Sequence, residues 1–234
     1  MKTRLLLIFL SLTSCLLAQD VKRNQTVAGV TALEASAGIN VFLRQGTPES
    51  VRVEAKGFEE DEIIAEKQGD KLVLSTRRRR GGGWSFGPFG KSRYVNAYVT
   101  VRTLNSISVS SGADLTGETT LTADDLTIRA SSGADLKMVV KTNRLTVSVS
   151  GGADATLSGS TEKLTASVSG GADLDADKLI ADVCYAEASG GGDARVHGRK
   201  ELHLRASGGG DVTYGGPGRV VSRKTSGGGD ITND

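Results

Sequence analysis

The chain of 234 residues is long enough for one large domain or two small ones. Only 4% of its residues are aromatic, whereas 31 are glycine, so a core must be built from Val, Leu, Ile and Ala in a regular arrangement. The glycines follow no Gly-X-Y period, which excludes collagen, and two cysteines are too few for a disulfide framework or a cysteine-based metal cluster.

Residues 1–18 carry Lys2 and Arg4, followed by an apolar run shorter than the roughly 20 residues of a membrane-spanning helix. This pattern predicts an export signal peptide. Cleavage after Ala18 removes both cations, so 27 basic residues remain against 27 acidic ones. A formally neutral mature chain, with no transmembrane segment, has no general attraction for nucleic acid or an anionic membrane. A second, less favoured interpretation treats "LTSC" at residues 12–15 as a lipoprotein box in which Cys15 is acylated.

Residues 19–104 are expected to form a strand-rich N-terminal region. Apolar and polar residues alternate in "INVFLRQ", "SVRVEAK", "DKLVLS" and "YVNAYVTV", which is the pattern of strands with one buried face. The stretch "SAGIN" at residues 36–40 resembles, at a distance, a motif that recurs later in the chain.

An insert at residues 77–93, "RRRRGGGWSFGPFGKSR", interrupts this region between two predicted strands. One interpretation is a solvated Gly-rich excursion with no ligand, whose residues 78–92 could be deleted without loss of the fold. The other is a polyanion contact, for which an acidic polysaccharide or a lipid phosphate suits an exported protein better than nucleic acid. The residues that would make this contact are Arg77, Arg78, Arg79, Arg80 and Trp84.

Residues 105–234 contain seven copies of a Ser-Gly-Gly-Ala-Asp type motif. The closing aspartates are 18 to 21 residues apart, a serine lies four positions before each, and a glycine lies two positions before each. The position directly before the aspartate is Ala in the first four copies and Gly in the last three. The clearest turn positions are Ser150, Gly152, Asp154, Ser169, Gly171, Asp173, Gly191, Asp193, Gly209, Asp211, Gly228 and Asp230.

Apolar residues alternate with polar ones on both sides of each motif, so each copy is predicted to be strand, Gly-rich turn and strand. A unit of about 19 residues cannot bury its own inner face, so neighbouring units must stack. We therefore predict an all-β fold, a single-stranded parallel β-solenoid of seven coils. The alternative is an antiparallel sandwich in which the copies form successive hairpins. In the last copy the inward positions turn polar at Arg223, Thr225 and Asn233, as expected of a terminal cap.

The stacked motif has a structural interpretation and a ligand interpretation. In the first, glycine supplies the turn conformation and the Ser and Asp side chains bond to nearby backbone groups. In the second, a row of carboxylates about 4.8 Å apart repels itself and recruits Ca²⁺. Calcium-binding β-rolls use a shorter period with further ligands, so Ca²⁺ is the weaker alternative and no cofactor is expected.

The segments "AGINVFLRQG", "VRVEAKG", "DKLVLS", "VNAYVTVRTLNSISVSSGADL" and the recurring "SGGAD" resemble the putative auto-transporter adhesin, head GIN domain family of bacterial envelope proteins, common in Bacteroidetes. The resemblance covers about residues 27–232. It implies a right-handed single-stranded β-helix preceded by a strand-rich portion, in an exported protein, and it implies no catalytic residue set.

An enzymatic function has little support. His197 and His203 are the only histidines and have no evident nucleophilic partner, and Cys184 falls in a predicted core column. We expect a non-enzymatic cell-envelope protein, an adhesin-like binding or assembly module located in the periplasm, on the cell surface or outside the cell. Its expected partner is a glycan or another envelope protein, and self-association is open. The alternative is a carbohydrate-active β-helix enzyme acting on an acidic polysaccharide.

Overall fold

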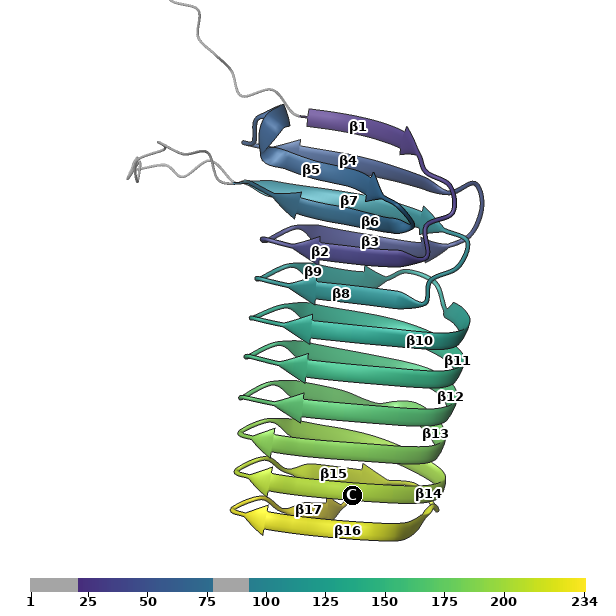
Figure 1. The fold of residues 1–234 in the computed structure, drawn as a ribbon, viewed down its shortest axis with the longest axis vertical. Helices are drawn as coiled ribbons and strands as arrows, with labels where there is room; N and C mark the ends of the chain where they lie inside the picture. The colour runs from purple at the N-terminus through teal and green to yellow at the C-terminus, as the bar shows by residue number, and fades with distance from the viewer. Residues whose placement is uncertain (1–20, 78–92) are drawn as a thin grey trace, which may run out of the picture.

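The computed structural model describes residues 21–77 and 93–234, which wind into one continuous stack of β-coils (Figure 1). The only helical element in these ranges is a 3-10 turn, η1 (Glu60–Glu62). The strands are β1 Val21–Thr26, β2 Ala32–Ser36, β3 Asn40–Gln45, β4 Ser50–Lys56, β5 Ile63–Gln68, β6 Lys71–Thr76, β7 Tyr94–Val101, β8 Ser106–Ser110, β9 Asp114–Gly117, β10 Leu121–Ser131, β11 Asp135–Ser150, β12 Asp154–Ser169, β13 Asp173–Gly190, β14 Asp193–Gly208, β15 Val212–Gly215, β16 Arg219–Gly227 and β17 Ile231–Asn233.

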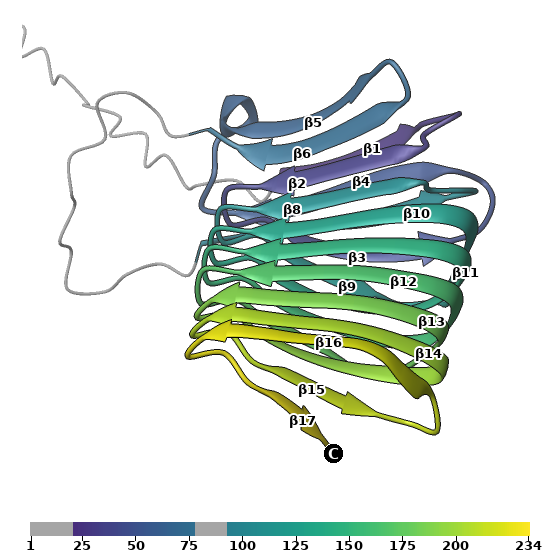
Figure 2. The ribbon, with the colours of Figure 1, turned by 60° about the horizontal axis from the view of Figure 1, so that its bottom comes forward.

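The stack has two faces, joined by a tight turn on one side and a rounded corner on the other (Figure 2). The segments that begin with the motif aspartate form one face, which we call the Asp face, and those that end with the motif serine form the Ser face. Strands β11–β14 bend at the corner and contribute to both faces. In β11, residues 135–141 lie on the Asp face and residues 144–150 on the Ser face.

Neighbouring coils pair in parallel, and the residues beside the tight turns are in register. Asp135 lies opposite Asp154, and Asp154 lies opposite Asp173, with the serines before each turn aligned in the same way. This confirms the predicted all-β parallel solenoid and rejects the antiparallel sandwich, because consecutive copies run in the same direction. The pairing is continuous because winding, rather than a crossover helix, returns the chain to the start of the next coil.

The N-terminal strands extend the same stack. β2 pairs in parallel with β8, and β3 pairs in parallel with β9, so residues 32–45 form a coil of the solenoid. Beyond this coil β7, β4 and β1 lengthen the Asp face, while β6 and β5 lengthen the Ser face. Antiparallel pairs occur here, between β1 and β4, β4 and β7, and β5 and β6. The stretch "SAGIN" makes the turn between β2 and β3, and Asn40 stands in the aspartate position opposite Asp114.

The core lies between the two faces and is made of small and medium aliphatic side chains. All of the largest fully buried residues are Leu or Ile, which agrees with the scarcity of aromatic residues. Alternate residues point inward along each strand, so Leu145, Val147 and Val149 of one coil stack on Leu164, Ala166 and Val168 of the next. The coils therefore share one continuous apolar interior, which no single coil could enclose.

The glycine positions do not all act as the sequence suggested. In the first four copies both central turn residues have positive φ, for example Gly151 (64°) and Gly152 (71°), as in type I′ turns. In the last three copies the positive φ falls three positions before the aspartate, at Gly190, Gly208 and Gly227, whereas Gly191, Gly209 and Gly228 lie outside the left-handed region.

This change of turn explains why Ala gives way to Gly directly before Asp193, Asp211 and Asp230. A Cβ at Gly192 would lie 3.0 Å from the backbone nitrogen of Ser169, and one at Gly210 would lie 2.7 Å from that of Ser189. Both contacts are with the backbone of the preceding coil, which cannot move aside cheaply. The last three turns therefore require a glycine where the first four accept alanine.

Arg223 covers the C-terminal end of the core. Its position pairs with the inward-facing Leu204 of β14, but the guanidinium reaches across the last coil, where Nη2 donates to the carbonyl oxygen of Ile231 and lies 3.9 Å from a carboxylate oxygen of Asp230. The predicted polar cap is thus a hydrogen-bonded arginine that joins β16 to β17.

Candidate binding surfaces

The motif aspartates form one column along the Asp face, beside the turns. Asp114, Asp135, Asp154, Asp173 and Asp193 lie directly opposite one another in successive strands, and all are solvent-exposed. Partial burial and the neighbouring carboxylate of Asp135 raise the pKa of Asp114, and partial burial, Asp173 and Asp135 raise that of Asp154. Ionising one carboxylate thus opposes ionising the next.

The hydrogen bonds made along this column differ between its middle and its two ends. In the middle of the stack the backbone N–H of Asp154 donates to the carbonyl oxygen of Ala134 at 2.9 Å. In the last copies a carboxylate takes the place of the carbonyl, because the N–H of Asp211 donates to Asp193 Oδ1 at 3.3 Å and that of Asp230 donates to Asp211 Oδ1 at 2.8 Å. At the N-terminal end Asn40 Nδ2 donates to Asn96 Oδ1, so uncharged amides replace the carboxylates.

The column does not gather a metal-binding cluster in the described parts of the chain, where no group of three His, Cys, Asp or Glu side chains is arranged to hold an ion. The carboxylates are instead spread one per coil. The expectation of no cofactor, with Ca²⁺ as the weaker alternative, stays a prediction from the sequence.

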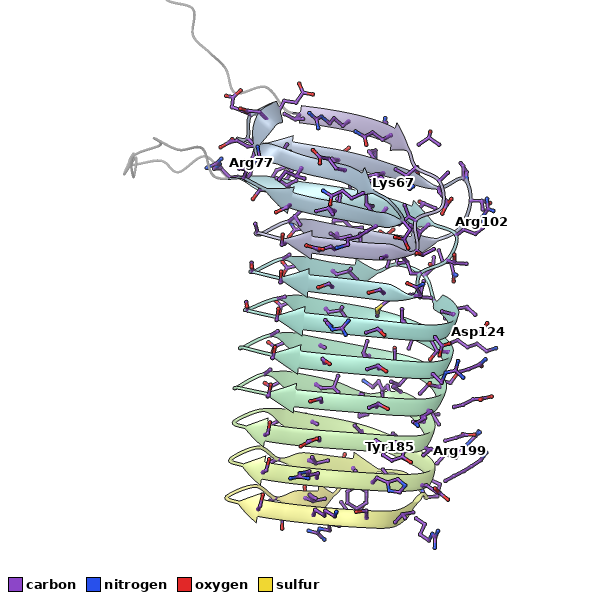
Figure 3. All side chains as sticks on the ribbon, viewed as in Figure 1. Lys67, Arg77, Arg102, Asp124, Tyr185 and Arg199 are labelled. Carbon is purple, nitrogen blue, oxygen red and sulfur yellow. The ribbon has the colours of Figure 1, made fainter. Side chains whose placement is uncertain are left out.

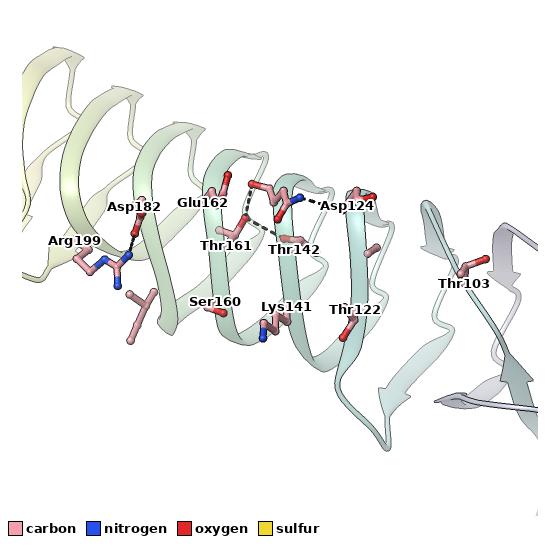
Figure 4. Close-up of a pocket in the computed structure, with 13 residues that line it drawn as sticks. Thr103, Thr122, Asp124, Lys141, Thr142, Ser160, Thr161, Glu162, Asp182 and Arg199 are labelled. Atoms are coloured by element: carbon pink, nitrogen blue, oxygen red, sulfur yellow. Dashed lines mark hydrogen bonds and ion pairs between the residues drawn. The ribbon is translucent and has the colours of Figure 1, made fainter.

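A polar groove follows the rounded corner, on the side opposite the turns (Figure 4). We call it the corner groove. It has a volume of about 590 Å³ and crosses the coils that contain β10–β14. Its lining residues are Thr103, Thr122, Ala123, Asp124, Lys141, Thr142, Asn143, Ser160, Thr161, Glu162, Ile180, Asp182 and Arg199.

The floor of the corner groove consists of threonine hydroxyls. Thr142 and Thr161 are buried, and Thr142 Oγ1 donates to Thr161 Oγ1 at 2.9 Å, while Thr161 Oγ1 also lies 3.1 Å from the carbonyl oxygen of Lys163. These bonds satisfy the buried hydroxyl groups at the bend. Ile180, 44% exposed, adds an apolar contact surface.

The rim of the groove carries charged and amide side chains that are already partly paired. Asn143 Nδ2 donates to Asp124 Oδ1 at 3.0 Å, and Asp182 makes ion pairs with Arg199 and, at 2.7 Å, with Lys200. The hydrogen bond from Lys200 and the nearby charge of Arg199 lower the pKa of Asp182. The groove therefore offers hydroxyl, amide, carboxylate and guanidinium groups to a polar ligand.

Aromatic side chains stand on the outer surface of both faces. On the Asp face Phe42 and Tyr98 stack with centroids 5.1 Å apart, and the guanidinium of Arg52 lies 4.2 Å from the Tyr98 ring. On the Ser face Tyr185 stacks on His203, with Tyr185 visible low on that face in Figure 3. Tyr185 and His203 share the position eight residues before a motif aspartate, which is the sequence signal that could have paired them.

Of the basic insert, only its two ends are described. The N–H of Arg77 donates to the carbonyl oxygen of Glu62 at 2.7 Å. Arg93 donates to the carbonyl oxygen of Gly57, lies 3.4 Å from Glu62 Oε2 and stacks on Phe58. The other residues assigned to polyanion contact, Arg78, Arg79, Arg80 and Trp84, lie outside the described residues, as do Cys15 and the predicted signal peptide.

Cys184 is fully buried between core side chains, and burial raises the pKa of its thiol to about 12. A thiol with this pKa is almost entirely protonated at neutral pH and is a poor nucleophile. His197 is half-buried opposite Ile180, and His203 faces outward, as its position in the repeat predicted.

The sequence model of the family described as "Putative auto-transporter adhesin, head GIN domain" matches residues 30–218. The chain belongs to this family. Among curated proteins, no relative matches it.

Solved structures support the fold of this family member. A putative adhesin from Bacteroides fragilis superposes with a TM-score of 0.79 at 21% identity, covering 92% of this chain and 97% of that one. A putative adhesin from Parabacteroides distasonis gives 0.71 at 19% identity, covering 93% and 98%. A putative lipid binding protein from the same organism gives 0.69 at 13% identity, covering 92% and 96%. None of the described residues belongs to a helix with the length and apolarity needed to span a bilayer.

Proposed function

We propose that this chain is an exported, non-enzymatic protein of the cell envelope that binds a glycan or another envelope protein through its solenoid surface. Membership of a family described as adhesins supports a binding role. The predicted signal peptide supports export to the periplasm, the cell surface or the medium.

The corner groove is the observation that carries this proposal. It runs across successive coils, and each coil presents side chains at corresponding positions, such as Thr142 beside Thr161 and Lys141 beside Ser160. An extended polymer lying along the groove would therefore meet polar groups at a regular spacing of about 4.8 Å. Hydroxyl, amide and carboxylate groups are suited to the hydroxyls of a sugar chain, and Ile180 offers a surface for its apolar parts.

The state of Asp182 in the groove and of Asp125 beside it supports binding rather than turnover. A glycosidase needs one carboxylic acid whose raised pKa keeps it protonated until it donates to the leaving group. Asp182 has a lowered pKa, because Lys200 and Arg199 bind its charged form. Asp125, next to the groove, is likewise held ionised by Arg144, which lowers its pKa.

A glycan array probed with the chain lacking its signal peptide tests the proposal, together with an assay for released products on every glycan that binds. We expect binding without product release. Combining Glu162→Ala with Ile180→Ala should weaken binding of the same glycan by about tenfold, as for the loss of a few contacts at the centre of a site.

The matched control is Lys137→Ala, which removes an exposed side chain of β11 on the Asp face, away from the groove. This variant should bind as the unaltered chain does. Release of product would contradict the non-enzymatic role, and equal effects of the groove and control variants would contradict the assignment to the groove.

A further inference from the structure

A second recess lies near the C-terminal end of the Ser face and shares no lining residue with the corner groove. Two outward rows of side chains border it. One row contains Tyr185, His203 and Ser222, and the other contains Glu187, Arg205 and Lys224, each residue lying opposite its neighbour in the adjacent strand.

The first row forms an aromatic wall. The rings of Tyr185 and His203 are 4.4 Å apart and nearly parallel, with an interplanar angle of 8°. Lys163 Nζ lies 5.0 Å from the Tyr185 ring. Beyond His203 the next residue in the row is Ser222, whose short side chain leaves space beside the imidazole. An apolar ring face of a ligand can pack in that space.

The second row places two cations side by side. Arg205 and Lys224 are direct partners in the parallel register of β14 and β16, and both are exposed. Like charges directly opposite each other destabilise a sheet. Glu187 offsets part of this repulsion, because its Oε1 lies 3.4 Å from Arg205 Nε, but it lies on the far side of Arg205 from Lys224. An anionic group between Arg205 and Lys224 would neutralise the pair.

The two rows border one open recess. A recess of about 260 Å³ is lined by both rows, and an adjoining one of about 520 Å³ is lined by Arg205, Arg223, Lys224, Thr225 and Ser226. Arg205 and Lys224 line both, so the aromatic wall, the two cations and the hydroxyls border a continuous surface. We call this surface the cation–aromatic recess.

We infer that the cation–aromatic recess binds an anionic sugar unit, with the sugar ring against the free face of His203, which Tyr185 supports from the other side, and its carboxylate or sulfate between Arg205 and Lys224. The ring hydroxyls would then lie within reach of Ser222 and Thr225. A neutral sugar would leave the Arg205–Lys224 pair without a counter-charge and would bind more weakly. This site stands separately from the corner groove and from the basic insert.

The test measures binding of the full chain to three soluble polymers: polygalacturonate, which carries carboxylates, dextran sulfate, which carries sulfates, and neutral dextran. We expect either anionic polymer to bind and dextran to bind at least tenfold more weakly at low salt. Binding of polygalacturonate alone would assign the carboxylate, dextran sulfate alone would assign the sulfate, and both would assign recognition of charge on a sugar.

Two variants locate the site. Lys224→Glu should weaken binding of the anionic polymer by about tenfold or more, because it reverses the charge at the proposed contact. Tyr185→Ala should weaken it by about fivefold through loss of the aromatic wall. Arg129→Glu is the matched control, since Arg129 is an exposed cation of the Ser face whose neighbour in β8 is Ser108 and which does not line the recess. It should leave affinity unchanged.

Several results would overturn the inference. These are equal binding of dextran, no binding of either anionic polymer, unchanged affinity in Lys224→Glu, or tighter binding of a single-stranded oligonucleotide of the same charge. Loss of binding only when residues 78–92 are deleted would place anion contact in the insert instead. None of these results would affect the glycan binding proposed for the corner groove, which is tested with other variants.

Discussion

The aspartate column shows how one repeated residue has two physical roles. In the middle of the stack, partial burial and the carboxylates of Asp173 and Asp135 in the strands on both sides raise the pKa of Asp154, so ionising it there has a cost. In the last coils the carboxylates of Asp193 and Asp211 accept backbone N–H bonds. The repeated aspartate therefore repels its neighbours in the middle of the stack and accepts backbone hydrogen bonds in the last coils.

Asp154→Asn should stabilise the protein at neutral pH, by about 1 kcal/mol for each relieved neighbour at most. The pKa of Asp154 is raised in the folded protein above its ordinary value of 3.8, so the folded state binds the proton more tightly than the unfolded state does. The stability that this proton contributes is present below pH 3.8 and is lost as the pH rises through the folded-state pKa. The gain from the substitution should therefore be present at pH 7 and absent at pH 3. Thermal unfolding of both proteins across this range measures it.

Asp211 provides the control for this prediction. Asp211→Ala removes the acceptor of the Asp230 N–H and should be about 1 kcal/mol less stable than Asp211→Asn, which keeps an acceptor oxygen. At position 154 the Ala and Asn variants should be alike. Equal stability of the two Asp211 variants would contradict the bonding role of that carboxylate.

At the scale of a structural element, the tight turn has two forms in this chain. The first four copies place two successive residues at positive φ, even where the first is a serine, as at Ser111 and Ser132. The last three need only one such residue but require glycine directly before the aspartate, because a Cβ there would meet the previous coil. The change from "GGAD" to "GGGD" is therefore the sequence mark of a different turn.

Gly190→Ala should destabilise the protein by about 1–2 kcal/mol, whereas Gly191→Ala should have little effect. Gly190 has φ of 72°, which a side chain adopts at a cost, and a Cβ there would lie 3.1 Å from Gly170 N. Gly191 lies outside the left-handed region, and its Cβ would meet nothing closer than 4.0 Å. Chemical denaturation of the two variants gives the comparison. A larger loss at Gly191 would show that the turn is wrongly assigned.

For the whole molecule, contacts run mainly between neighbouring coils, so stability should be close to a sum over coils and their interfaces. The buried columns beside the turns continue from β11 to β14, and the pairing shifts only near the corner. The two ends differ from this pattern, with antiparallel strands at one and Arg223 at the other. The length of the stack is thus independent of how its ends are closed.

Deletion of residues 154–172 should give a folded protein with one coil fewer. The deletion joins Ala153 to Asp173, which occupies the same position in the next copy, so every inward residue stays inward. Circular dichroism and thermal unfolding should show a β-rich protein that melts cooperatively at a moderately lower temperature. Deletion of residues 154–163 alone breaks the coil and should prevent folding. Folding of both, or of neither, would contradict this account.

How much of this could be predicted from the sequence depends on distance from the motif. Within the nine residues before each aspartate, the alternation of apolar and polar residues predicted which side chains face the interior and which face the surface. His203, which faces outward, and the polar cap at Arg223 are examples. Around the corner the coils differ in length, and the pairing of β13 with β14 shifts between Ala176 and Ile180. The corner groove and the partners of Asp182 therefore could not be derived from the repeat.

The turn change was also beyond the sequence, because Gly at a given position reveals conformational freedom but not which φ is adopted. The same limit applies to Arg223: the alternation placed a polar residue at the open end, but only the folded structure shows its guanidinium bonded to the carbonyl oxygen of Ile231.

The buried thiol of Cys184 has a further consequence. Its sulfur lies inside the coil of β13 with no exposed surface, and burial raises the pKa of the thiol to about 12, so almost no thiolate is present while the stack is closed. An alkylating reagent or an oxidant can therefore modify this atom only when the coils separate there. The rate of its modification measures how often the stack opens around β13, without any residue being substituted to supply a probe.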